Sequence, residues 1–175
     1  MAITAGDYLR PARSLASSSV PSLICLESSG QSFKPGELLQ MRSGKVALCN
    51  TTSDVLKIGS ASGTIYGVSA TTGKNLTGTP NWNQSSDTVS IIPAVHWMMW
   101  EVAVANSTTA SSVIAATNIG LTYVLKRSTT NKVWYLSLAS TAAHFTVLGF
   151  RDAVGTRNGH VYGVFHDSAR FAAIK

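Results

Sequence analysis

The motif Gly-x-x-Tyr-Gly-Val occurs twice in this chain, at residues 63–68 and again at residues 159–164. Each copy follows a turn and has the composition of a β-strand. Each copy also lies downstream of a strand–turn–strand pattern, which begins at Leu38 in the first half and at Leu121 in the second. A strand plan that is repeated in this way favours two related β halves, which we expect to close one barrel or sandwich.

The composition of the chain indicates the same fold class. Charged residues make up only 13% of the 175 residues, which is about half of the usual share. Serine and threonine supply the missing polarity, and short apolar runs alternate with turns rather than following a helical period. We therefore predict an all-β fold, a single barrel or sandwich of about ten strands.

The first 32 residues differ from the rest of the chain. This segment is rich in serine and has weak periodicity, apart from one short apolar strand at residues 23–26. We interpret residues 1–32 as an extended N-terminal arm, with a disordered tail as the alternative, and residues 33–175 as the β-barrel domain. The short strand is able to complete a sheet of that barrel. The residues of the arm that we expect to bind a partner are Arg10, Arg13, Leu23 and Ile24.

One expected strand is apolar on both faces. From Val95 to Ala105 the side chains alternate with period two, and both faces are largely apolar around Trp97 and Trp100. A strand of this kind lies in the centre of a sheet or faces another subunit. We therefore name Trp97 and Trp100 as candidate partner-binding residues, with core packing as the alternative.

Residue types that carry catalysis are present, but no chemical pattern joins them. Residues 67–75 superficially resemble a phosphate-binding loop, yet five residues separate the glycines and asparagine replaces the hydroxyl residue that binds Mg²⁺. His160 and His166 lie on one expected strand at a separation of about 20 Å, which is too far for one metal ion. A Gly-x-Ser-x-Gly elbow is also absent from the sequence. We predict no enzyme activity, no cofactor and no metal site.

Charge and hydropathy restrict the partners. The net charge of +6 indicates solubility or an acidic partner surface, and the scattered basic residues argue against nucleic-acid binding. The most apolar run, residues 91–105, is too short to cross a membrane and contains Pro93 and Glu101. The N-terminus lacks the features of a signal peptide, so we expect synthesis in the cytoplasm. Cys25 and Cys49 are expected to be free buried thiols, with a disulfide as the alternative.

Four blocks of turn and strand residues resemble those of a known family. The blocks are residues 32–46, 67–68, 118–123 and 145–161, which read SFKPGELLQMRSGKV, GV, NIGLTY and FTVLGFRDAVGTRNGHV. In these blocks the chain resembles the small β-barrel decoration (cement) proteins on the heads of tailed double-stranded-DNA bacteriophages. The resemblance extends over residues 32–166.

The resemblance implies a structural role without catalysis. It implies a place on the outer surface of the virion capsid, where the chain binds the major capsid protein and stabilises the particle. It also implies a homo-oligomer, frequently a trimer. The alternatives are a nucleic-acid-binding β-barrel and another phage structural part, such as a head-fibre base or a minor tail protein.

Overall fold

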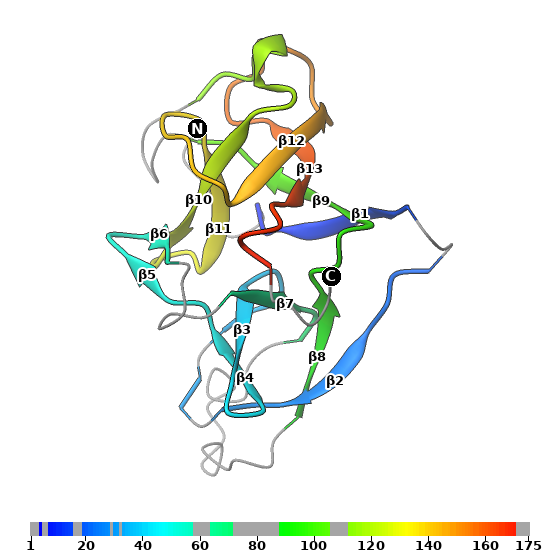
Figure 1. The fold of residues 1–175 in the computed structure, drawn as a ribbon. Coiled ribbons are helices and arrows are strands. Elements are labelled where there is room, and N and C mark those ends of the chain that lie inside the picture. Colours follow the sequence, from blue (N-terminus) through cyan, green and yellow to red (C-terminus); the bar gives the residue numbers. More distant parts are fainter. Residues whose placement is uncertain are drawn as a thin grey trace.

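The computed structural model describes residues 4, 7–15, 19–28, 30–31, 33–57, 64–71, 88–105 and 112–170. The regular elements within these residues are thirteen β-strands and one short 3-10 helix (Figure 1), so the predicted all-β fold is confirmed. The sequence also predicts a short strand at residues 171–174 and a long polar loop at residues 71–88. The strand and most of the loop lie outside the described residues.

The strands divide between the two halves of the chain. Those of the first half are β1 (Arg10–Ser14), β2 (Leu23–Leu26), β3 (Leu38–Arg42), β4 (Lys45–Leu48), β5 (Thr51–Thr52), β6 (Val55–Leu56), β7 (Ile65–Ser69) and β8 (Thr88–Pro93). Those of the second half are β9 (Met98–Ala103), β10 (Thr122–Ser128), β11 (Val133–Ser137), β12 (Phe145–Phe150) and β13 (His160–Phe165), with the 3-10 helix η2 (Ala116–Asn118) between β9 and β10.

Five strands of the first half form a sheet that closes on itself. The strand order is β2-β8-β7-β3-β4, and neighbouring strands are antiparallel. Directly after β2, Glu27 forms a parallel bridge with Val46 on the free edge of β4, and the Ser28 N–H donates to the Val46 carbonyl over 2.8 Å. This contact joins the first strand of the sheet to the last, and we call the closed sheet barrel 1 (lower part of Figure 1).

The five strands of the second half close in the same manner. Their order is β9-β13-β12-β10-β11. Directly after β9, Val104 forms a parallel bridge with Leu136 on β11, and the Ala105 N–H donates to the Leu136 carbonyl over 2.9 Å. We call this sheet barrel 2 (upper part of Figure 1). Each half therefore closes its own small barrel, where the sequence led us to expect one barrel built from both.

The two barrels share their register as well as their strand order. Strands β2, β3, β4, β7 and β8 of barrel 1 correspond to β9, β10, β11, β12 and β13 of barrel 2. Just before the closing bridge, Leu26 pairs with Thr88, the first residue of the last strand in barrel 1. At the same place in barrel 2, Ala103 pairs with His160. The halves therefore repeat one topology position by position.

A glycine turn leads into the second strand of each barrel at equivalent positions. The Gly36 N–H donates to the Ser69 carbonyl over 2.8 Å in barrel 1. The Gly120 N–H donates to the Val147 carbonyl over the same distance in barrel 2. Both glycines have positive φ angles, 84° and 81°, which other residues adopt only with strain.

The repeated Gly-x-x-Tyr-Gly-Val motif does not mark equivalent strands. The Tyr-Gly-Val part of the first copy lies on β7, the fourth strand of barrel 1, and that of the second copy lies on β13, the fifth strand of barrel 2. A Cβ atom on Gly67 would clash with the carbonyl oxygen of Ile92 on the neighbouring strand. A Cβ atom on Gly163 would clash in the same way with that of Thr146. In both barrels, the second glycine of the motif allows the fourth and fifth strands to approach each other closely.

The N-terminal segment is part of the folded body, so the expected boundary at residue 32 does not separate two structural units. Strand β1 pairs antiparallel with β9 and extends the sheet of barrel 2. Leu9 is 1% exposed and belongs to the large hydrophobic core, while β2 is a strand of barrel 1. The segment lacks a clear hydrophobic period because it does not form one continuous element. Its strand β1 belongs to the sheet of barrel 2, and its strand β2 belongs to barrel 1.

The barrels are joined by a common core and a buried ion pair. The largest hydrophobic cluster combines Trp100 and Trp134 of barrel 2 with Leu38 of barrel 1. Next to Leu38, the carboxylate of Glu37 is fully buried and pairs with the guanidinium of Arg127 on β10. The β5–β6 hairpin also reaches from the first half to the second, where β6 pairs with β10. These contacts fix the two barrels against each other.

Candidate functional site

The residues expected to bind a partner do not share one surface. Trp100 is fully buried and packs against Phe165 at a ring-centroid distance of 5.2 Å, so it belongs to the core and not to the expected binding surface. Trp97 is half-buried and packs against the same core. Strand β9 is apolar on both faces because it lies between β1 and β13 in the larger sheet.

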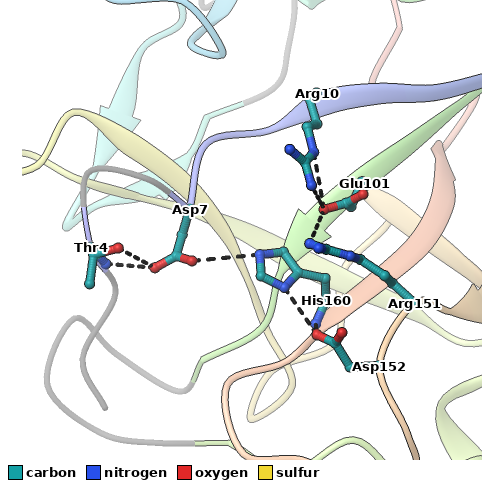
Figure 2. Close-up of polar contacts among 7 residues, drawn as sticks. All are labelled: Thr4, Asp7, Arg10, Glu101, Arg151, Asp152 and His160. Atoms are coloured by element: carbon teal, nitrogen blue, oxygen red, sulfur yellow. Dashed lines mark hydrogen bonds and ion pairs between the residues drawn. The ribbon is translucent and has the colours of Figure 1, made fainter.

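Arg10 is engaged within the chain. It faces Glu101 on β9, and its Nη2 atom lies 2.6 Å from Glu101 Oε1 (Figure 2). Arg151, directly after β12, donates to the same oxygen over 2.7 Å. The hydrogen bond to Glu101 raises the pKa of Arg10. Arg10 therefore anchors the N-terminal segment to barrel 2, whereas Arg13 is exposed.

A second group of contacts fixes the start of the same segment. Figure 2 shows His160 between two carboxylates, with Nδ1 3.1 Å from Asp152 Oδ2 and Nε2 3.5 Å from Asp7 Oδ1. Asp7 in turn accepts hydrogen bonds from the N–H and the hydroxyl of Thr4, both over 2.8 Å. Burial opposes ionisation of Asp152, but the hydrogen bonds from His160 outweigh it and lower the pKa of Asp152. Since both ring nitrogens face carboxylates, this arrangement orders the segment and leaves neither nitrogen to activate a nucleophile.

An exposed apolar stripe follows the anchored segment. After β1 the chain crosses from barrel 2 to β2 of barrel 1 (Figure 1), and the large apolar side chains in the described part of this stretch are exposed. Ile24 is the most exposed of them, at 71%. Single exposed apolar residues are ordinary, and we consider this group a candidate binding surface because its members fall close together in the sequence. Along β2, Leu23 points to the opposite face from Ile24 and Leu26. The members of this N-terminal stripe are Leu15, Val20, Leu23, Ile24 and Leu26.

A second exposed apolar surface, which local sequence patterns did not predict, lies at one end of barrel 2. It is formed by the turn around Gly120, by β12 and its connection to β13, and by the segment before η2, which bridges that connection through Val113 and Arg157. In barrel 1 the equivalent turn at Gly36 is covered, because Tyr8 and Leu9 lie directly against it. The available signal was an apolar residue next to a turn glycine, Ile119 before Gly120 and Val154 before Gly155. The members of this barrel 2 end patch are Val113, Ile119, Leu121, Leu148 and Val154.

The cysteines are both free thiols, so the disulfide alternative is excluded. Cys49 is buried and Cys25 is half-buried. Burial raises the pKa of both thiols, which keeps them protonated and poorly nucleophilic. They belong to the packing of barrel 1 and its interface rather than to a reactive site.

The histidines have separate roles. His144 is buried and accepts a hydrogen bond from the Leu125 N–H over 3.2 Å, and burial lowers its pKa to about 4. His96 and His166 line a pocket of about 220 Å³ together with Arg170. Arg170 forms an ion pair with Asp167. Among the described residues, no group of three or more histidine, cysteine, aspartate or glutamate side chains is placed to hold a metal ion.

No protein-family model, curated protein or solved structure matches this chain. A search of the described residues for a helix that could span a membrane, judged by length and hydropathy, finds none.

Proposed function

We propose that this chain is a structural protein without catalytic activity that binds the outer surface of a tailed-phage capsid and stabilises it. The N-terminal stripe carries the proposal, because five large apolar side chains lie exposed within one short stretch of the chain. Capsid binding through such a surface buries apolar area, and each Å² removed from water contributes about 25 cal/mol before the costs of association.

The low charge of the chain supports the same role. A surface with few ionised groups can be buried between protein subunits without a large desolvation penalty. The barrel 2 end patch provides a second exposed apolar surface, which suits a protein that contacts more than one neighbour. The turn and strand blocks that resemble phage decoration proteins add the identity of the partner, the major capsid protein.

The proposal also includes a homo-oligomer, with a trimer expected from the resemblance. Analytical ultracentrifugation of the purified chain over a range of concentrations measures this directly. A monomer at all concentrations would remove the oligomer from the proposal and leave capsid binding to be tested separately.

Co-sedimentation tests the capsid role. Purified chain is mixed with undecorated heads of the phage that encodes it, and bound protein is measured in the pellet. We expect saturable binding at micromolar concentration with a fixed number of copies per head. No co-sedimentation, combined with a mobility shift of DNA that weakens steeply with salt, would instead favour the nucleic-acid-binding alternative.

A further inference from the structure

We infer that the free edge of β2 binds an extended segment of a partner protein, which adds to barrel 1 as an antiparallel strand. The identity of that partner as the capsid protein rests on the proposed function. The binding mode rests only on the comparison between the two barrels.

In barrel 2 the equivalent edge already holds an added strand. Strand β1 pairs with β9 over residues 98–101, before the chain reaches the closing bridge at Val104. The same positions of barrel 1 are residues 21–24, before the closing bridge at Glu27. Within the part of the chain that the structure describes, no strand pairs with that stretch of β2 on the side away from β8.

The backbone of Ile24 points to this open side. Ile24 pairs with Ser90 on β8, and the carbonyl of Ser90 accepts a hydrogen bond from the N–H of Ala70 on its other side. Because backbone groups alternate in direction along an antiparallel strand, the N–H and carbonyl of Ile24 face away from β8. An exposed pair of this kind is a template for an incoming strand.

The side chains specify what the incoming strand carries. In barrel 2 the added strand places Arg10 opposite Glu101, and the two side chains form an ion pair. Ile24 occupies the position of Glu101 in barrel 1 and is 71% exposed. An incoming strand in the same register therefore places an apolar residue, and not an arginine, opposite Ile24. The ligand is an extended, uncharged segment with an apolar side chain at that position.

A pair of variants of the full chain tests the backbone contribution. Ile24→Pro keeps an apolar side chain but removes the outward N–H, and proline is tolerated at an edge where that N–H is not paired. Ile24→Thr keeps the N–H and favours a strand. Thermal unfolding shows whether each variant is folded.

The probe is a synthetic peptide with the sequence of residues 8–15 in which valine replaces Arg10 and serine replaces Arg13, so that its side chains are uncharged, titrated against ¹⁵N-labelled protein. We expect the amide signals of residues 23–26 to shift in the wild type, with the Ile24 amide exchanging more slowly when peptide is bound. Ile24→Pro should bind about tenfold more weakly, and Ile24→Thr within about threefold of the wild type.

The outcomes separate the inference from the proposed function. Shifts that map elsewhere than β2, no shifts at millimolar peptide, or equal binding by Ile24→Pro and the wild type would overturn strand addition. If Ile24→Pro fails to fold, the exchange rate of the wild-type Ile24 amide decides the question. Failure of the wild type to co-sediment with heads would overturn the capsid role and leave the peptide result standing.

Discussion

In barrel 2 the edge of β9 is covered by β1, whereas in barrel 1 none of the described strands covers the equivalent edge of β2. The ends of the two barrels show the reverse arrangement. The turn at Gly36 is covered by Tyr8 and Leu9. At the equivalent turn, no described residue beyond the two chain neighbours of Gly120 has an atom within 4 Å of the place where a Cβ would lie. One N-terminal segment therefore covers one site on each barrel and leaves the counterpart of each site exposed.

The two barrels have equivalent sites because they share one strand topology. The side chains at these sites differ, and they determine whether a site is covered or exposed. Glu101 of barrel 2 is paired with arginines, while Ile24 at the same position of barrel 1 is exposed. Glu37 of barrel 1 is buried with its cation, while Leu121 at the same position of barrel 2 is 47% exposed. The exposed apolar surfaces thus lie where the other barrel has a covered site.

Breaking the buried ion pair between the barrels should have the largest effect on the free energy of unfolding. Arg127→Met leaves the Glu37 carboxylate buried without its cation, which typically costs about 3–5 kcal/mol. We expect the free energy of unfolding, measured with urea, to fall by about this amount. The double variant Glu37→Leu/Arg127→Met, which copies the Leu121 position of barrel 2, should recover most of the loss. A loss below about 1 kcal/mol would mean that the pair behaves as an exposed one.

The two turn glycines give the most direct contrast between the barrels. Gly120→Ala should cost about 1–2 kcal/mol from backbone strain alone, since nothing lies near the added methyl group. Gly36→Ala should cost about 1–3 kcal/mol more, because its Cβ would lie 2.8 Å from the Leu9 carbonyl oxygen and from Tyr8 Cβ. Thermal unfolding of both variants checks this difference. Equal losses would contradict the covering of one turn by the N-terminal segment.

Acid should weaken barrel 2 before barrel 1. The strands of barrel 1, from residue 23 to residue 93, contain no histidine, whereas burial lowers the pKa of His144 in barrel 2 to about 4. Below pH 6.5 the unfolded chain binds a proton at this site that the folded chain binds only near pH 4. Stability should therefore fall as the pH is lowered from about 6.5 to 4, by up to about 2–3 kcal/mol, and this term is absent above pH 6.5.

His144→Gln provides the control, because its amide oxygen can accept the Leu125 N–H without titrating in this range. Unfolding free energies of both proteins are compared at pH 7 and at pH 4.5. We expect the free energy of unfolding to fall less between pH 7 and pH 4.5 in the variant than in the wild type. In the wild type, as the pH is lowered, the amides of barrel 2 should lose protection against hydrogen exchange before those of barrel 1. The same acid loss in both proteins would exclude His144 as its cause.

Removing one anchor of the N-terminal segment should have the smallest effect. The Arg10 side chain is 42% exposed, so solvent screens its ion pair with Glu101, and Arg151 remains to pair with the carboxylate. Arg10→Ala should lower stability by about 1 kcal/mol or less. Faster hydrogen exchange along β1 is the expected signature. A loss above about 2 kcal/mol would show that β1 depends on this contact much more than its exposure indicates.

Local patterns in the sequence predicted the strands but not their closure. Alternation and turn residues identified the all-β class and the β3–β4 and β10–β11 hairpins, because these depend on neighbours in the chain. The closing bridges depend on contacts between distant residues, and almost no residue is shared between equivalent strands. The repeated motif drew attention to two related halves, although it marks a packing demand at non-equivalent strands.

The candidate site was predicted only in part for the same reason. Leu23 and Ile24 are exposed and remain candidates, as the apolar run in a polar segment suggested. The burial of Trp100 and the pairing of Arg10 with Glu101 could not be inferred locally, because both depend on β1 and β13 lying on either side of β9. The barrel 2 end patch was missed because its residues come from separate segments of the chain, among them Leu148 on β12 and Val154 in the connection to β13, which only the fold brings to one end of the barrel.

Co-sedimentation of single variants with undecorated heads tests the central claim most directly. Ile24→Asp places a charge on the N-terminal stripe, and Thr52→Asp places the same charge on the exposed β5–β6 hairpin as a matched control. We predict that the wild type and Thr52→Asp bind heads with the same affinity, while Ile24→Asp remains folded and binds at least about tenfold more weakly. Binding of Ile24→Asp that equals the wild type would contradict the assignment of this surface to the capsid.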